Sequence, residues 1–306
     1  MKKYFRVSED VQAAVAAGKA VLALESTIFT HGLPRPRNAE VALEAEASLR
    51  EIGVVPATIG VVSGEVVVGL SSAEIKRLSD GSEPVIKAST RDLPIASAKK
   101  LHAGTTVAAT AFAAHAAGIK VFSTGGLGGV HRGADKTFDE SADLSALAQV
   151  PLVVVSAGVK SILDIGLTLE RLETLNIPVI GYGTTDYPGF YISDSGFDID
   201  YSVDTPEEVA EIAWSRDALH ITSTLLVANP VPASKQLAPE TLERVLAAAH
   251  SAAGGAGIKG HDTTPFLLDY IQKATNGESL EVNVEVYRNN VALGGRIALA
   301  LAKRSS

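Results

Sequence analysis

The 306-residue sequence contains no cysteine and only one tryptophan. Without cysteine there can be no disulfide, no thiolate metal site and no cysteine nucleophile. Basic residues are not in excess either, because 27 Lys and Arg stand against 35 Asp and Glu, for a formal charge of −8. Proteins that bind a nucleic acid polymer usually carry a basic stripe, so no such partner is expected.

Long apolar runs are also missing. The run at 150–159 is far shorter than the ~20 residues of a membrane-spanning helix, and the N-terminus lacks the apolar core of a signal peptide. The chain has no GxSxG elbow, HExxH helix, P-loop or GxGxxG fingerprint. These absences predict a cytoplasmic protein without a membrane segment, and they exclude several common catalytic classes.

Predicted strands and helices alternate along the chain, which is typical of an α/β protein. Buried strands are expected as continuous apolar runs, at Ala20–Leu24, Val85–Ser89, Lys120–Ser123, Pro151–Ser156 and Pro178–Tyr182. Helices are expected at 38–50, 105–117 and 162–175, among others. No repeat or long linker interrupts the pattern. The sequence therefore predicts a single domain over residues 1–306, with a three-layer α/β/α fold around a largely parallel or mixed central sheet.

Polar residues follow several of these strands, and ligands of open α/β sheets bind at the carboxyl ends of strands. Lys160 comes shortly after the strand at 151–156, and Gly158 permits close approach of the backbone. A lysine held in an apolar pocket, or near a second cation, loses its proton more readily and becomes nucleophilic. The alternative is a lysine that reaches from a strand end to water.

Two further charged residues lie at the same expected edge of the sheet. Glu25 follows the strand at 20–24 and can act as a general acid or base, or else cap the following turn. Lys87 lies near the end of the strand at 85–89, where it can steer an anionic substrate.

An acidic cluster is formed by Asp139, Glu140 and Asp143, with Ser141 and Ala142 between them. Divalent cations such as Mg²⁺ and Mn²⁺ bind one or two carboxylates plus waters, so the cluster can hold a metal. The alternative is an acidic start to the helix expected from 144.

A phosphate site is a second possibility along the chain. Gly104, Thr105, Thr106 and Val107 open a predicted helix, and free amides with hydroxyls at a helix start suit a phosphate. Plain threonine capping is the alternative. His131 lies in the glycine-rich stretch 124–133, either as a substrate ligand or as an ordinary loop histidine.

These segments together resemble the pseudouridine-5'-phosphate glycosidase family, from about Ala20 to Ala300. The motifs that carry the resemblance are ALEST at 23–27, HGLPRPRN at 31–38, VPATIGVVSGEVVVGL at 55–70, RDLP at 91–94, GTTVAAT at 104–110, STGGLGGVHRGADKTFDESADL at 123–144, AGVKSILD at 157–164, ANPVP at 228–232, TPFLL at 264–268 and NNVAL at 289–293. Because so many motifs match in the same order along the chain, the resemblance is specific.

The resemblance implies reversible cleavage of pseudouridine 5'-phosphate to uracil and ribose 5-phosphate by a homotrimer with one Mn²⁺ per subunit. It implies that Lys160 forms an iminium with the ring-opened sugar, that Glu25 is the acid and that Asp139 binds the metal. The resemblance implies substrate contacts for Lys87, Val107, Ser141, Ala142 and Asp143, and positions in the pocket for His131 and Asn283. Thr106 is also expected to bind substrate, because it lies at the start of the predicted helix.

The sequence departs from the family pattern at Thr90, Glu140 and Val282, where relatives usually carry an arginine, an aliphatic residue and a small polar residue. These departures leave open a C-glycosynthase that joins ribose 5-phosphate to another aromatic acceptor. A non-catalytic sugar-phosphate-binding protein is the alternative of another class. Retention of Lys160, Glu25 and Asp139 together argues against it.

Overall fold

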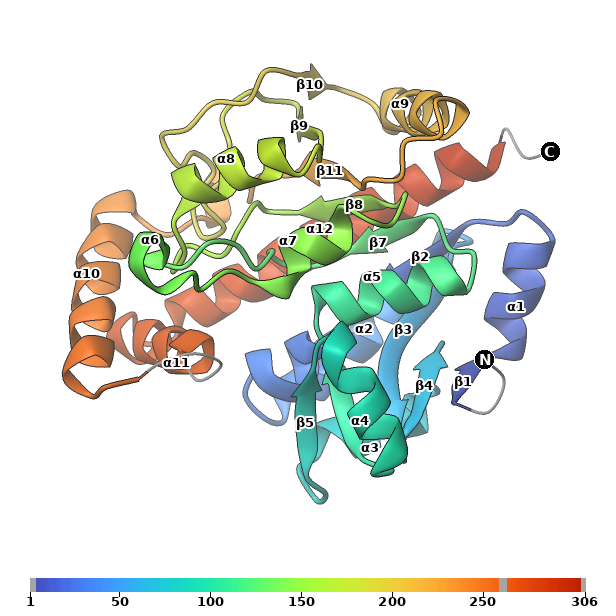
Figure 1. The fold of residues 1–306 in the computed structure, drawn as a ribbon, viewed down its shortest axis with the longest axis horizontal. Coiled ribbons are helices and arrows are strands. Elements are labelled where there is room, and N and C mark those ends of the chain that lie inside the picture. The colour runs from blue at the N-terminus through green and yellow to red at the C-terminus, as the bar shows by residue number, and fades with distance from the viewer. Residues whose placement is uncertain (1–3, 259–262, 304–306) are drawn as a thin grey trace.

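Within residues 4–258 and 263–303, which the computed structural model describes, eleven strands form one mixed sheet (Figure 1). The strands are β1 (Phe5–Val7), β2 (Val21–Leu24), β3 (Val55–Val62), β4 (Glu65–Val68), β5 (Val85–Ala88), β6 (His102–Thr105), β7 (Val121–Ser123), β8 (Val153–Ser156), β9 (Val179–Tyr182), β10 (Ser202–Val203) and β11 (Leu225–Ala228). The main part of the sheet is parallel, in the order β3-β2-β7-β8-β11-β9-β10.

The long strand β3 joins this parallel part to a smaller mixed part. Its first half pairs with β2 in the parallel sense, with Val55 opposite Val21. Its second half pairs with β4 and β6 in the antiparallel sense, and β5 lies parallel to β6. The sheet is therefore mixed, as the sequence predicted.

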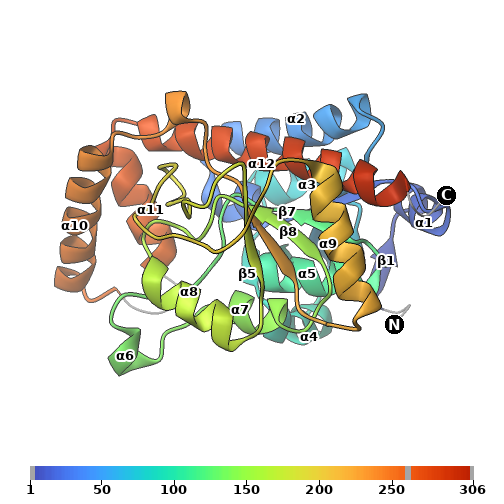
Figure 2. The same cartoon turned by 90° about the horizontal axis from the view of Figure 1, so that it is seen from above.

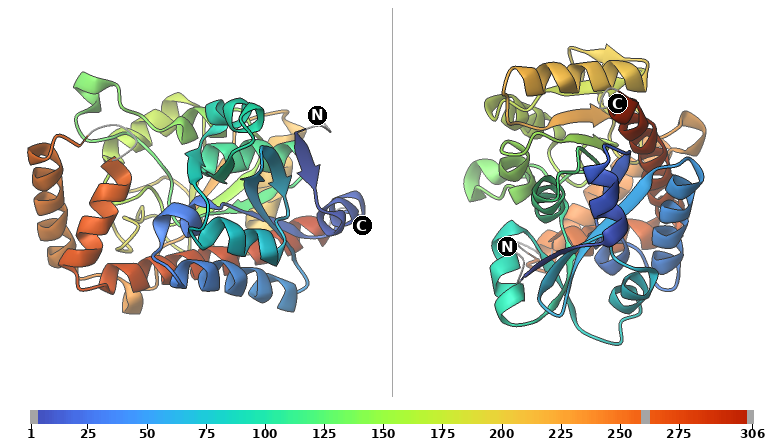
Figure 3. Two further views of the ribbon diagram at one scale, coloured as in Figure 1. Left: turned by 90° about the horizontal axis from the view of Figure 1, so that it is seen from below. Right: turned by 90° about the vertical axis from the view of Figure 1, so that its right-hand side faces the viewer.

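Helices cover both faces of the sheet (Figure 2). One face carries α2 (Arg37–Glu51), α9 (Pro206–Ala218) and α12 (Glu278–Lys303); the other carries α5 (Val107–Ala116), α7 (Ala142–Leu147) and α8 (Ile165–Thr174). Helices α10 (Pro239–Gly255) and α11 (Thr263–Ala274) stand at one end, beside the start of α12 (Figures 1 and 3). This arrangement is the predicted three-layer α/β/α fold.

The buried side chains explain why the central strands are apolar throughout. Successive residues of a strand point to opposite faces, so Val21 and Ala23 join the core on one side of the sheet while Leu22 and Leu24 join the core on the other. Both faces are covered by helices, and no position in such a strand faces water.

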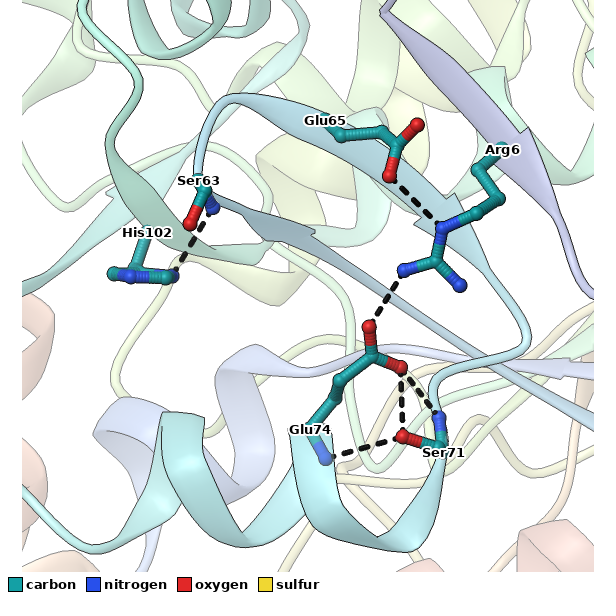
Figure 4. Close-up of polar contacts among 6 residues, drawn as sticks. All are labelled: Arg6, Ser63, Glu65, Ser71, Glu74 and His102. Carbon is teal, nitrogen blue, oxygen red and sulfur yellow. Dashed lines mark hydrogen bonds and ion pairs between the residues drawn. The ribbon is translucent and has the colours of Figure 1, made fainter.

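Strand β1 pairs with β4, packs Phe5 and Val7 against the core, and is tied further by charged side chains (Figure 4). Arg6 bonds Glu65 of β4 at 2.8 Å and also pairs with Glu74 of α3 (Ser72–Ser79). Glu74 accepts a further bond from the amide of Ser71, which caps α3. A three-residue strand held by side chains elsewhere in the chain leaves no pattern in its own sequence, and β1 was not predicted.

Other elements also differ from the sequence-based expectation. The helix expected from Thr105 begins at Val107, because Gly104 and Thr105 belong to β6. The remaining short α-helices are α1 (Glu9–Ala16), α4 (Leu93–Ala98) and α6 (Ala134–Thr137), and single helical turns form at Ile28–Gly32, Thr90–Asp92 and Ala233–Lys235. No helix in the described part of the chain is both long and apolar enough to cross a bilayer.

Candidate active site

A pocket opens beyond the carboxyl ends of β2, β7 and β8. Four residues predicted from the sequence, Glu25, Lys87, Lys160 and Asn283, line it together. The remaining lining residues are Thr27, Ile28, His31, Gly32, Gly125, Gly126, Phe190, Thr264, Pro265 and Leu268. Helices α11 and α12 thus close the end of the pocket away from the sheet.

Glu25 is held by two hydroxyl groups. Its side chain is only 5% exposed, and the hydroxyls of Thr27 and Thr124 each donate a short hydrogen bond to a different oxygen of the carboxylate. Thr124 is fully buried directly after β7, so this bond ties the end of β2 to the end of β7. The carboxyl group therefore has one fixed orientation at the pocket wall.

Lys160 owes its place to a turn that requires glycine. Gly158 has φ +78°, and a Cβ there would lie 2.4 Å from the carbonyl oxygen of Pro188. The chain can then turn back, and the Lys160 amide donates to the Leu127 carbonyl at 3.1 Å. The aliphatic part of Lys160 lies near Gly126, where a side chain would collide with Phe190.

Lys87 lies close enough to Lys160 for the two charges to interact. Its side chain reaches the surface, but the protein around the ammonium lowers the pKa of Lys87, and repulsion from Lys160 lowers it further. Asp143 and Glu25 act in the opposite direction. Lys87 lies near the end of its strand, as predicted: it is the residue before the last of β5, opposite Gly104 of β6.

Two histidines belong to the same electrostatic cluster. Burial lowers the pKa of His31, and Lys87 lowers it further. Burial also lowers the pKa of His131, with Lys87 and Lys160 adding to the effect and Asp139 opposing it. His31 was not predicted from spacing, although it opens the HGLPRPRN motif.

Asp143 connects two backbone segments. Its carboxylate accepts from the amide of Ala108, in the first turn of α5, and from the amide of Gly128, both at 2.9 Å. Ser141 caps α7 by accepting from the Asp143 amide, and exposed Ala142 begins that helix. The three residues thus lie where the glycine-rich stretch meets the start of α5.

The start of α5 offers fewer hydroxyls than its sequence suggests. Thr105 is fully buried, and its hydroxyl donates to the Ile59 carbonyl at 2.7 Å, so it is not available to a ligand. Thr106 caps the helix through its side chain. Val107 buries its side chain and can meet a ligand only through its backbone.

A metal site at Asp139 would rest on few protein ligands. Across residues 4–258 and 263–303, no group of three or more His, Asp or Glu is arranged to hold a metal ion. Asp139 and His131 are near enough to interact, and Mn²⁺ accepts a carboxylate, an imidazole and waters. The donor types fit such an ion, with water completing its shell.

The three departures from the family pattern have different surroundings. Glu140 pairs with Arg171 of α8 at 2.9 Å. Val282 is a residue of α12 and is buried in the apolar core. The hydroxyl of Thr90 is buried and has no hydrogen-bond partner in the described residues.

The family model of indigoidine synthase A-like proteins matches residues 10–300. The chain belongs to this family. It is 62% identical over 296 residues to a pseudouridine-5'-phosphate glycosidase of Saccharopolyspora erythraea, with 97% of each chain covered. It is 48% identical over 303 residues to a pseudouridine-5'-phosphate glycosidase of Clostridium botulinum, with 99% of each chain covered. The resemblance predicted from the motifs is thus confirmed.

Two solved structures share the fold of this family member. The prealnumycin C-glycosynthase AlnA, in complex with ribulose 5-phosphate, is 32% identical with a TM-score of 0.91, over 99% of this chain and 98% of that one. An indigoidine synthase A-like protein of Thermotoga maritima is 36% identical with a TM-score of 0.87, over 97% and 96%. Both confirm the α/β/α architecture.

The lowered pKa of Lys87 predicts a dependence of stability on pH. The unfolded chain binds more protons than the folded chain between the lowered pKa and the ordinary value of 10.5, so wild-type stability gains from Lys87 as pH rises through that interval. Lys87→Met should be more stable than wild type at pH 7, and the difference should shrink toward pH 10.5. Urea unfolding at several pH values measures it. Lys99→Met, at an exposed position after α4, is the control for the loss of a lysine.

Proposed function

We propose that the chain catalyses the reversible cleavage of pseudouridine 5'-phosphate to uracil and ribose 5-phosphate. The observation that carries this proposal is the meeting of a lysine, a buried glutamate and a second lysine, Lys160, Glu25 and Lys87, in one pocket. The high identity to proteins named for this activity supports the same substrate.

The chemistry of the bond explains why a lysine is needed. A C-glycosidic bond has no exocyclic oxygen to protonate, so a pair of carboxylates working as in ordinary glycosidases is poorly suited to it. In the proposal, the Lys160 amine bonds to C1' of the sugar while the bond from C1' to the ring oxygen breaks. Glu25 carries the proton released by the amine to that ring oxygen.

The carbon–carbon bond then breaks with the help of the lysine nitrogen. Its lone pair forms the iminium as C1' separates from C5 of uracil, and the uracil ring takes the electron pair and a proton. Water hydrolyses the iminium and releases ribose 5-phosphate and free Lys160. In the reverse direction the iminium is the electron sink that C5 of uracil attacks.

The phosphate would be held by cationic and backbone groups. The ammonium of Lys87 supplies charge, and the first turn of the ten-residue helix α5 supplies the backbone amide of Val107, since the Thr106 amide already donates to the Ala88 carbonyl. Ser141, Ala142 and Asp143 would shape the same end, and Asn283 and His131 would face the sugar and base.

A C-glycosynthase reaction remains the second candidate. It is supported by the likeness to AlnA, which covers nearly the whole chain. Both reactions use the same iminium, and they differ only in the ring that leaves or attacks C1'. An assay in the synthetic direction, with uracil and a panel of aromatic acceptors, distinguishes them.

The covalent role of Lys160 can be tested by trapping. Borohydride added during turnover should reduce the iminium and leave a ribose-phosphate mass on the peptide that contains Lys160. Lys160→Ala should lose both the adduct and turnover while it remains folded. Lys87→Ala should lower kcat/KM by about 10–100-fold, as expected for loss of a hydrogen bond to a charged group, but still permit trapping. An adduct mapped to Lys87 would reverse the roles.

A Mn²⁺ ion at Asp139 and His131 also belongs to the proposal. A bound divalent cation would offset phosphate charge and order water near the sugar. Calorimetry should detect Mn²⁺ binding to the wild type. The affinity of Asp139→Asn for Mn²⁺ should be lower by roughly tenfold or more. Chelated protein should lose activity and regain it with Mn²⁺ better than with Zn²⁺. Full activity with no detectable metal would contradict this part of the proposal.

The homotrimer implied by the resemblance is proposed as well. Apolar side chains available for contacts between copies include Phe138, Tyr201 and Leu219, which are 86%, 69% and 70% exposed in the single chain. Sedimentation equilibrium at micromolar concentration should give three times the chain mass, and a monomer would contradict it.

A further inference from the structure

A buried amide network lies directly behind the pocket. Asn290 of α12 is 0% exposed, and its Nδ2 donates to the carbonyl oxygens of Thr124 at 2.8 Å and Gly125 at 3.1 Å. Its Oδ1 accepts from Nδ2 of Asn229, the residue after β11, at 2.9 Å. One side chain thus connects α12 with the segments that follow β7 and β11.

The orientation of this amide is determined by its partners. Carbonyl oxygens only accept hydrogen bonds, so the nitrogen of Asn290 must face Thr124 and Gly125. Its oxygen must then face Asn229, whose nitrogen is the donor. Both donors of Asn290 and one lone pair of its oxygen are used, and a flipped amide would oppose oxygen to oxygen at two places.

The network leads to both reacting residues. Thr124, whose carbonyl Asn290 holds, donates its hydroxyl to Glu25. The carbonyl of Gly125 also accepts from the amide of Ala157 at 3.0 Å, three residues before Lys160. Asn290 therefore fixes the short segment that lies between Glu25 and Lys160.

Packing of α12 does not require an amide at this position. Apolar side chains of the same helix already hold α12 against the sheet. Four of them are at most 1% exposed: Val286, Tyr287, Val291 and Leu293. Burying a polar side chain costs free energy that an apolar residue would not, unless its hydrogen bonds compensate. We therefore ascribe the presence of an amide at position 290 to the geometry that it imposes on residues 124 and 125.

We propose that Asn290, oriented by Asn229, is a positioning residue for the reaction, which acts by holding Thr124 so that its hydroxyl fixes the Glu25 carboxyl group. This inference rests on the proposed function, because it assigns Glu25 to proton transfer there. Neither asparagine is among the residues that line the pocket, and neither was assigned a role from the sequence.

The test is steady-state cleavage of pseudouridine 5'-phosphate by the full chain. Asn290→Ala is expected to lower kcat by about 10–100-fold while KM changes by less than about threefold, because the lost contacts support reacting groups rather than bound substrate. Asn229→Ala removes only the donor to Oδ1 and should give a smaller loss of kcat in the same sense. It keeps the test valid where Asn290→Ala does not fold.

A double-mutant cycle separates positioning from general weakening of the fold. In the Glu25→Gln background, Asn290→Ala should lower the residual kcat by less than about twofold, since residues that act as one unit are not additive. Thr124→Val should lower kcat, and Thr124→Ser, which keeps the hydroxyl, should restore it. Thr224→Val is the matched control: Thr224 is also 0% exposed and donates to the Val150 carbonyl at 2.8 Å, but it precedes β11 at the opposite end of the sheet. Its kcat should stay at the wild-type value.

Two results would overturn the role of Asn290 alone. One is a folded Asn290→Ala with wild-type kcat, and the other is an equal loss of kcat with and without the Glu25 carboxyl group. Absence of cleavage by the wild-type protein is a different failure, which removes the proposed function and this role with it.

Discussion

The site depends on the point at which β2 ends and another strand takes its place beside β3. The last residue of β2, Leu24, lies opposite Thr58, and from Gly60 onward β3 pairs with β6 instead. Ser26 closes this junction, because its buried hydroxyl accepts from the Thr105 amide at 2.8 Å and lies 3.2 Å from the Thr105 hydroxyl. The chain can therefore leave the sheet between Leu24 and Ser26, and Glu25 turns into the pocket.

The same exchange of strands brings Lys87 to the site. Strands β5 and β6 run against β3, so the general rule that ligands meet the carboxyl ends of parallel strands does not apply to them. Lys87 pairs with Gly104, which pairs with Gly60, and this row lies just past the end of β2. The strand-end argument thus placed Glu25 and Lys160 at this edge of the sheet for the correct reason. It identified Lys87 although its premise about that strand was wrong.

Prediction from the sequence succeeded where a local pattern carries the information. Continuous apolar runs revealed the parallel strands. The close approach of the backbone expected at Gly158 is also present, because a Cβ there would lie 2.4 Å from the carbonyl oxygen of Pro188. Thr124 and Asn290 were missed, because the bond between them joins residues 166 positions apart and leaves no local pattern. His31 and Phe190 were missed for a similar reason: each lines the pocket from a segment whose place is determined by packing against other elements. Asn229 and Asn290 lie in the motifs ANPVP and NNVAL, which carry the family resemblance. The motifs alone do not show what either side chain does.

The partners of the two buried carboxyl groups distinguish their roles. Asp143 is held by the backbone amides of Ala108 and Gly128, which can only donate, so a proton on its carboxyl group would cost it a hydrogen bond. Glu25 is held by the hydroxyls of Thr27 and Thr124, and a hydroxyl can rotate to accept a hydrogen bond as readily as it donates one. Glu25 can therefore gain and lose a proton without losing a partner. Hydroxyl partners therefore suit the proton transfer that the proposed reaction requires of Glu25, and amide partners suit a carboxylate that joins two backbone segments.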